Sequence, residues 1–285
     1  MSLGAIFALI ALGYTMVYGV LRFINFAHCD VFMVGAFAGY YIGQHVPEHS
    51  IGGGLLALAG AMAACAALGV IIERLAYRPL RGAPTLNVLI TAIGVSLLLE
   101  NLGQFAFGAT PRAYPELFPV RTFQLGGVFV STNQLVVIGV TLVLLFALRF
   151  IVLHTRIGTA MRALSLNRQA ASLVGINNDF VISCTFALGS ALAAAGGILY
   201  ALNYPSIDPL MGVLPGLKAF VAAVLGGIGN IPGAALGGLL LGVVETFVNG
   251  SEWSTYKDAI AFAILIIIML FRPAGLLGKF TVEKV

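Results

Sequence analysis

Charged side chains are scarce in this chain of 285 residues. Asp, Glu, Lys and Arg together make up 9% of it, while 60% is hydrophobic. A soluble globular domain carries about 25% charged residues, so this chain cannot cover a water-exposed surface of its size. The mean hydropathy of +1.02 agrees. The composition excludes a disordered chain and an ordinary soluble enzyme, and it predicts an integral membrane protein.

Cysteine and histidine are also few, with three and four residues. The cysteines lie in or beside apolar segments without paired or metal-ligand spacing, which excludes a secreted disulfide scaffold. Pro47, between His45 and His49, argues against the helix that these two histidines would need to share a metal ion. The sequence also lacks a Ser/His/Asp set and a pair of carboxylates suited to catalysis. We therefore expect a non-enzymatic protein with no cofactor and no metal site.

What the sequence does contain is apolar segments, and they predict an all-α, polytopic membrane helix bundle formed by a single domain over residues 1–285. The segments are Ser2–Leu21, Asp30–Gln44, Ile51–Leu75, Leu86–Phe107, Gln134–Leu153, Val181–Leu202, Leu214–Ile228, Gly233–Asn249 and Asp258–Phe271. A spanning helix uses about 20 apolar residues, so the second, seventh and ninth segments are short. Short segments of this kind indicate half-helices or re-entrant elements. About eight or nine membrane segments are expected, the first of them retained as a span.

Basic residues divide unequally between the two ends of these segments, with 11 of the 15 Lys and Arg residues at one end. This larger set comprises Arg22, Arg74, Arg78, Arg81, Arg149, Arg156, Arg162, Arg168, Arg272, Lys279 and Lys284. Basic residues mark the cytoplasmic face. We therefore expect the N-terminus outside and the C-terminus inside, which requires an odd number of crossings.

The longest outer loop covers residues 108–133. It contains Pro111, Pro115, Pro119, Gly126 and Gly127, which indicate turns and a short hairpin.

A cytoplasmic loop over residues 154–180 is the most informative stretch. Asn167 is a good helix N-cap, and Gly175 suits the left-handed position that ends a helix. Together they predict a short helix over Arg168–Val174 that carries small apolar residues. The helix either docks into a groove on a partner or rests on the bilayer surface, and the spacing alone does not decide between these.

Two motifs in this loop resemble known transport proteins. Gln169-Ala170-Ala171 followed by Gly175 resembles the Glu-Ala-Ala…Gly loop of ABC importer permeases, and the stretch from Thr155 to Ala163 is similar to the branched-chain amino acid permease family. The resemblance implies that this loop couples the chain to ATPase subunits. The residues so implied are Arg156, Gly158, Met161, Arg162, Ala163, Asn167, Gln169, Ala170, Ala171 and Gly175. Because Gln169 stands where the general motif has Glu, no salt bridge is expected there.

Two further stretches resemble the same family, and they are most similar to the first of its two paralogous permeases. Ile24–Asp30 is similar to the family's Asn-Phe-Ala-His-Gly-acid signature, with Cys29 in the place of Gly. Asn25, His28 and Asp30 are interpreted either as caps plus an interfacial histidine, or as a gate or substrate-facing turn at a helix break.

The second stretch, Phe220–Ala234, is similar to the family's late Gly-Gly-x-Gly-x-x-Pro-Gly sequence. Gly227, Gly229 and Pro232 do not fit a nucleotide loop, because Pro232 replaces the third glycine. They predict a tight turn between two membrane helices, and we also include them among the candidate pathway or gate residues. Gly233/Gly237 and Gly238/Gly242 are pairs of small residues suited to close helix packing, first within the subunit and second between permeases.

The isolated ionisable residues inside apolar segments, apart from the basic residues already assigned to the cytoplasmic ends, are Glu100, Lys218 and Glu245. Each is costly in lipid and should face protein or water. We interpret Glu100 as an interfacial group at an outer helix end. Opposite sign and proximity predict that Lys218 pairs with Glu245.

The resemblance implies the permease subunit of an ATP-driven importer for branched-chain amino acids in the bacterial inner membrane. Its expected partners are a second permease, two cytoplasmic ATPase subunits and a periplasmic or lipid-anchored binding protein. Related systems handle urea, short amides or other amino acids, and these substrates stay open. An ion-coupled secondary transporter or channel is the alternative from another class, although it would need more intramembrane carboxylates. No nucleic-acid partner is expected.

Overall fold

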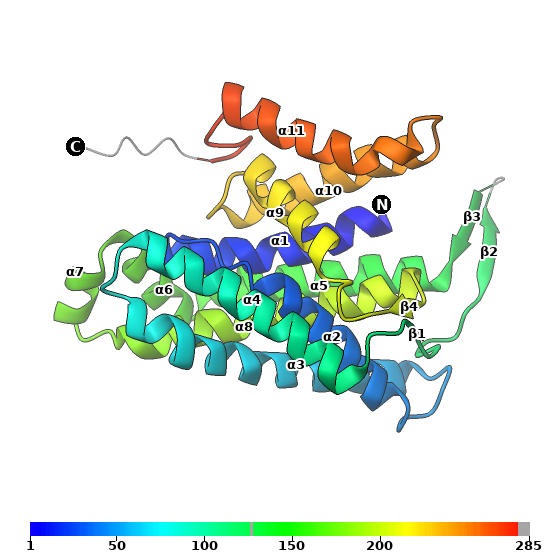
Figure 1. Cartoon of the computed structure of the whole chain (residues 1–285), viewed down its shortest axis with the longest axis horizontal. Helices are drawn as coiled ribbons and strands as arrows, with labels where there is room; N and C mark the ends of the chain where they lie inside the picture. Colours follow the sequence, from blue (N-terminus) through cyan, green and yellow to red (C-terminus); the bar gives the residue numbers. More distant parts are fainter. Residues whose placement is uncertain (126–127, 279–285) are drawn as a thin grey trace.

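The computed structural model describes residues 1–125 and 128–278, and these residues are mostly helical (Figure 1). The helices are α1 Ser2–Leu21, α2 His28–Gly43, α3 Ile51–Ile72, α4 Thr85–Phe107, α5 Thr132–His154, α6 Arg156–Leu166, α7 Arg168–Leu173, α8 Asn178–Asn203, α9 Val213–Gly226, α10 Ile231–Asn249 and α11 Lys257–Phe271. Short helical turns are η1 Glu73–Tyr77, η2 Arg78–Leu80 and η3 Ser254–Tyr256. The predicted polytopic helical bundle is confirmed. Gly126, Gly127, Lys279 and Lys284, for which we predicted turns and cytoplasmic charges, lie outside the described residues.

The two ends of the bundle differ. One end carries α6 and α7, and the other carries four short strands, β1 Arg112–Ala113, β2 Thr122–Leu125, β3 Val128–Ser131 and β4 Ser206–Ile207 (Figure 1). β1 pairs with β4, and β2 forms an antiparallel hairpin with β3, as predicted for the outer loop. Arg22 and Arg78 lie at the α6–α7 end, where they contact Ser165 and Asp179. The positive-inside rule therefore assigns this end to the cytoplasm.

Among the described residues, seven helical stretches are long and apolar enough to span a membrane. The ninth predicted segment is one of them, because η3 runs directly into α11 and the combined stretch Ser254–Phe271 has 18 residues. Its interpretation as a short or re-entrant element is therefore wrong.

The second and seventh segments are short, as predicted. α2 begins beside the middle of α1, where His28 Nε2 lies 3.2 Å from the carbonyl oxygen of Ile10. α9 begins beside Cys29, against which Gly212 and Gly216 are packed, and it runs to the cytoplasmic end. Each short helix and the non-helical stretch before it complete one traverse of the bundle. Within residues 1–125 and 128–278 the chain therefore passes from one end of the bundle to the other nine times. This is an odd number, as expected for termini on opposite sides of the membrane.

The pair α8–α9 repeats the arrangement of α1–α2 in the opposite direction. In each pair a long helix is followed by a non-helical return and a short helix that starts near the centre of the bundle (Figure 1). Inverted repeats with discontinuous helices are a common architecture of membrane transporters, and their sites lie near the bilayer midplane.

α1 forms the centre of the bundle, with most of its residues buried against α5, α8, α9 and α10. Two glycines of α10 permit the closest of these contacts: a Cβ on Gly238 would meet the backbone of Ala8, and one on Gly242 would meet Gly4. The small-residue pair Gly238/Gly242 therefore packs helices within the subunit, which was the first of the two uses predicted.

Candidate functional site

The first cytoplasmic helix, α6, is fixed against the end of α5. Thr155 Oγ1 accepts a hydrogen bond from the Gly158 N–H at 3.2 Å and donates to the Ile151 carbonyl at 2.6 Å. Gly158 is buried, and a Cβ there would collide with the carbonyl oxygens of Ile151 and Val152. Met161 is also buried. Gly158 and Met161 therefore hold α6 in position and do not face outward.

α7 begins and ends as the sequence predicts. Asn167 Oδ1 accepts hydrogen bonds from the backbone N–H groups of Gln169 and Ala170, at 2.9 and 3.0 Å. Gly175 follows the helix with φ of +84°, a left-handed conformation that favours glycine. The short helix is therefore defined at both ends by local side-chain and backbone chemistry.

The exposed face of this helix differs from the one expected. Ala171 is 3% exposed and packs inward, so it is not part of the surface offered to a partner. Leu166, Leu173 and Val174 are instead 86%, 87% and 76% exposed. Leu166 was not among the predicted site residues, although a large aliphatic residue at the end of a cytoplasmic helix was a usable signal.

The remaining residues predicted to couple lie around these aliphatic side chains. Arg156, Arg162, Gln169 and Ala170 are exposed, and Ala163 is half-buried. We define the coupling surface as Leu166, Gln169, Ala170, Leu173 and Val174. Figure 1 shows α7 as the outermost element at the cytoplasmic end.

At the centre of the bundle, two interpretations of the sequence are wrong. Asn25 does not cap α2 with its side chain, because its Oδ1 accepts a hydrogen bond from the Tyr77 hydroxyl at 2.6 Å. The N-cap position is Ala27, which has no capping side chain. His28 is not interfacial, since it is 1% exposed and lies against the middle of α1.

The first turn of α2 joins three helices. Asp30 lies in this turn, as predicted, and its Oδ2 accepts a hydrogen bond from Ser96 Oγ of α4 at 2.5 Å. Cys29 Sγ lies 2.7 Å from the Tyr14 hydroxyl of α1. On its other side Cys29 packs against Gly216 of α9. The two half-helices therefore meet through Cys29, the residue that replaces the usual glycine.

The glycine-rich stretch after α9 is the tight turn that the sequence predicts. Gly227 and Gly229 have φ of +104° and +92°, and Pro232 lies in the first turn of α10. Gly229 approaches Gly19 near the cytoplasmic end of α1. The structure thus separates these residues from Asn25, His28 and Asp30, and the two parts of the predicted pathway set are not brought together.

The predicted ion pair between Lys218 and Glu245 is confirmed. The Lys218 Nζ lies 2.7 Å from Glu245 Oε1, and both side chains are buried. Asp258, in the first turn of α11, adds a carboxylate 2.5 Å from the same nitrogen. Asp258 was not predicted as a partner of Lys218, because it lies 40 positions further along the chain with α10 in between. One lysine therefore links α9, α10 and α11.

A bundle of spanning helices, with two half-length helices that meet at its centre, defines a polytopic membrane permease. The chain belongs to the family of permease components of branched-chain amino acid transport systems, which matches residues 1–269.

Named relatives agree with this family. The chain is 42% identical to the high-affinity branched-chain amino acid transport permease BraD of Pseudomonas aeruginosa, over 100% of this chain and 95% of that protein. It is equally identical to LivH of Escherichia coli K12, with the same coverage. The ribose import permease RbsC of Escherichia coli K12 is 28% identical over 83% of this chain and 72% of its own length.

These similarities favour the permease class over the ion-coupled transporter or channel that was the alternative from the sequence. The chain is a transport permease component and a multi-pass protein of the bacterial inner membrane.

Proposed function

We propose that the chain forms half of the membrane pathway of an ATP-driven importer, and that the coupling surface binds its ATPase subunits. The observation that carries this proposal is the exposure of Leu166, Leu173 and Val174 at the extreme cytoplasmic end of the molecule. Large aliphatic side chains gathered on a water-facing surface mark interaction sites. A helix that rested on the bilayer would keep such side chains in lipid, beside the long helices and not beyond them.

The contacts of α6 and α7 would carry motion from this surface into the membrane. Thr155 and Gly158 fix α6 to α5, while Asn178 Nδ2 of α8 donates to the Arg168 carbonyl at 3.1 Å. Arg168 Nη2 in turn donates to the Leu21 carbonyl at the end of α1, at 3.3 Å. Binding of α7 by a partner that changes shape with ATP would therefore shift α1, α5 and α8 together.

The partners follow from this role. We propose a second permease, two ATPase subunits that hydrolyse the ATP, and a binding protein that delivers substrate to the outer face. The sequence has no P-loop Gly-Lys-Ser/Thr of its own, in agreement with ATP hydrolysis elsewhere.

The proposed substrates are branched-chain amino acids. Support comes from the names of BraD and LivH at 42% identity. Uptake of radiolabelled leucine, isoleucine and valine into cells with the complete transporter tests this assignment. Uptake of urea or a short amide that excess leucine leaves unchanged would contradict it.

We further propose that the start of α2, with Asn25, His28 and Asp30, forms a gate in the pathway. Two half-helices begin at this level, and half-helix ends near the midplane are common transporter sites. The turn at Gly227, Gly229 and Pro232 would act at the cytoplasmic end of the same half-helix α9, as a separate hinge.

The coupling surface is tested by replacing Leu173 with aspartate. Leu173 is 87% exposed, so the folded permease should persist, while the ATPase subunits co-purify poorly and leucine uptake falls. Gly82→Asp is the matched control, because a side chain at this cytoplasmic position would meet open space. Normal co-purification and uptake for Leu173→Asp would refute the docking role. Ala171→Arg is a poor test, since a buried position would also disturb folding.

A further inference from the structure

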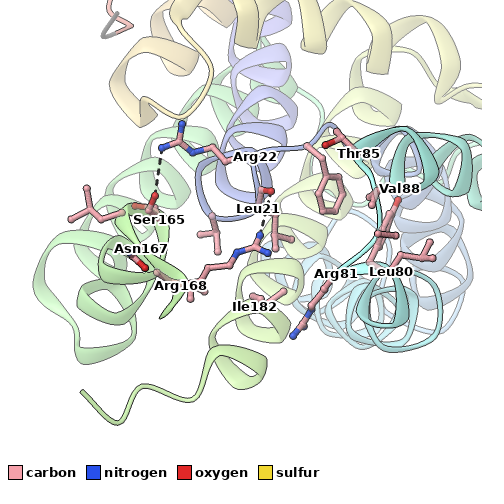
Figure 2. Close-up of a pocket in the computed structure, with 16 residues that line it drawn as sticks. Leu21, Arg22, Leu80, Arg81, Thr85, Val88, Ser165, Asn167, Arg168 and Ile182 are labelled. Carbon is pink, nitrogen blue, oxygen red and sulfur yellow. Dashed lines mark hydrogen bonds between the residues drawn. The ribbon is translucent and has the colours of Figure 1, made fainter. Parts of the chain in front are cut away.

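A cavity of about 430 Å³ lies at the cytoplasmic end of the bundle. Its walls come from the end of α1, the turn η2 with the start of α4, the α6–α7 segment and α8 (Figure 2). This volume falls within the range of about 300–1,000 Å³ that is typical of small-molecule sites. The cavity thus lies between the first membrane helix and the coupling segment.

The lining is strongly positive. Arg22, Arg81 and Arg168 all contribute to it, and the described lining residues include no Asp or Glu. The positive charge of Arg81 is already balanced, because its guanidinium forms ion pairs with Glu73 and Asp179. Neither Arg22 nor Arg168 has a carboxylate partner within residues 1–125 and 128–278.

The two unpaired guanidinium groups bond only to carbonyl oxygens in the described part of the chain. Arg22 donates to the Ser165 carbonyl at 3.4 Å, and Arg168 donates to the Leu21 carbonyl at 3.3 Å. Figure 2 shows the two side chains crossing between α1 and the α6–α7 segment in opposite directions. Such long bonds to neutral acceptors are readily replaced by charge-assisted bonds to an anion.

The fold brings both arginines to the cavity without balancing their charge. Burial, and then the positive charge of Arg81, lower the pKa of Arg168, which reflects a guanidinium without a compensating negative charge. Arg22 is the C-cap of α1, with φ of +61° and its backbone N–H donating to the Tyr18 carbonyl, a left-handed conformation that commonly ends a helix. The end of α1 therefore places Arg22 in the cavity wall.

Beyond the arginines, part of the wall is polar but uncharged and part is apolar. Val20, Leu80 and Val88 belong to the apolar part, and Thr85, Ser165 and Asn167 to the polar part. On α4, which begins at the cavity, Leu86 and Ile90 are exposed in a helix apolar enough to span a bilayer. An occupant that combines a negative group with a short hydrocarbon part would match the arginines and the apolar part of the lining.

We propose that this cavity binds a phosphate group, held by Arg22 and Arg168, and that its source is an anionic phospholipid of the cytoplasmic leaflet. Arginine is well suited to phosphate because its planar fork donates two parallel hydrogen bonds. The glycerol and first methylenes of the lipid lie along the apolar wall. A bound phosphate bridges the end of α1 to the coupling segment and replaces the two carbonyl contacts with stronger ones.

The experiment measures lipid retained by the purified transporter after reconstitution in mixed phosphatidylcholine and phosphatidylglycerol nanodiscs. Native mass spectrometry counts bound phosphatidylglycerol for the wild type and for Arg22→Gln/Arg168→Gln. We expect roughly hundredfold weaker retention in the double variant, about tenfold for the charge-assisted bond of each arginine. Arg149→Gln is the matched control, because Arg149 is an exposed arginine at the same end and does not line the cavity. Its retention should equal that of the wild type.

Two further measurements complete the test. Arg22→Lys/Arg168→Lys keeps both charges without the forked geometry, and intermediate retention in this variant separates phosphate binding from a folding defect. Calorimetry with inorganic phosphate, in nanodiscs of phosphatidylcholine alone, tests the other source. Phosphate binding that the Gln variant abolishes, without retention of phosphatidylglycerol, supports the phosphate site and overturns the lipid as its source. Equal retention in the wild type and the Gln variant, with no phosphate binding, overturns the proposal. These readouts do not depend on transport, so they stand whichever substrate is imported.

Discussion

Replacing Lys218 by methionine tests how much the buried ion network stabilises the fold. The substitution removes the positive charge between Glu245 and Asp258, which lie 2.7 and 2.5 Å from its nitrogen. Glu245 is 6% exposed and loses its partner. Removing one member of a buried pair costs about 3–5 kcal/mol. At roughly 2–4 °C per kcal/mol for a domain of this size, we expect a fall in melting temperature of about 6–20 °C.

Substitutions of Glu245 and Asp258 should lower the stability of the fold less than Lys218→Met does, and the Asp258 substitution should lower it least. Glu245→Gln leaves Lys218 paired with Asp258, so its cost is about 1–3 kcal/mol. The side chain of Asp258 is 38% exposed, and water can replace its partner, so Asp258→Asn should cost at most about 1 kcal/mol.

The decisive variant combines Lys218→Met with Glu245→Leu. A fold with an apolar pair is often as stable as one with the buried ion pair that it replaces. This variant should therefore recover most of the melting temperature lost in Lys218→Met. Exchanging the two charges should recover less, because the exchange moves a carboxylate to the position facing Asp258. Thermal unfolding in detergent, followed by fluorescence size-exclusion chromatography, measures each melting temperature. Lys257→Met provides the control, since Lys257 forms no ion pair with the described residues. A double variant no more stable than Lys218→Met would refute the reasoning.

Three more outcomes are expected. Gly158→Ala should sharply reduce the yield of folded protein, because the added Cβ meets carbonyl oxygens at the end of α5. The control Gly139→Ala adds its Cβ in open space on α5 and should be neutral or stabilising. Equal yields of the two variants would contradict the close packing of α6. Asn167→Ala should destabilise α7 by about 1 kcal/mol, seen as faster amide hydrogen exchange confined to the helix, and unchanged exchange would argue against the cap. Ser96→Ala should impair uptake less than Asp30→Asn if the carboxylate itself serves the proposed gate, and equal losses would assign Asp30 a purely structural role.

Features that depend on neighbours in sequence were predictable. The ends of α7 follow from Asn167 and Gly175, because a cap and a left-handed glycine act over two or three residues. The short α2 and α9 follow from the lengths of their apolar segments. The partner of Lys218 followed from charge, because an isolated charge in lipid needs an opposite one.

Features set by distant packing were not predictable. Asn25 bonds to Tyr77, 52 positions away, and no local pattern reveals that this contact replaces a cap. Ala171 is buried because α7 folds back onto α8, whereas composition alone favours an exposed small residue. The length of α11 was missed because η3 adds a turn of polar and aromatic residues that hydropathy does not count.

The central position of α1 has a consequence for how the protein is made. α1 leaves the ribosome before the other described helices, yet α10, which packs its glycines against Gly4 and Ala8, emerges more than 220 residues later. Until then the surface of α1 that will be covered by protein must be accommodated by lipid or by the insertion machinery. The described part of the chain therefore stays open in the membrane until α10 has been synthesised, and only then can it close around α1.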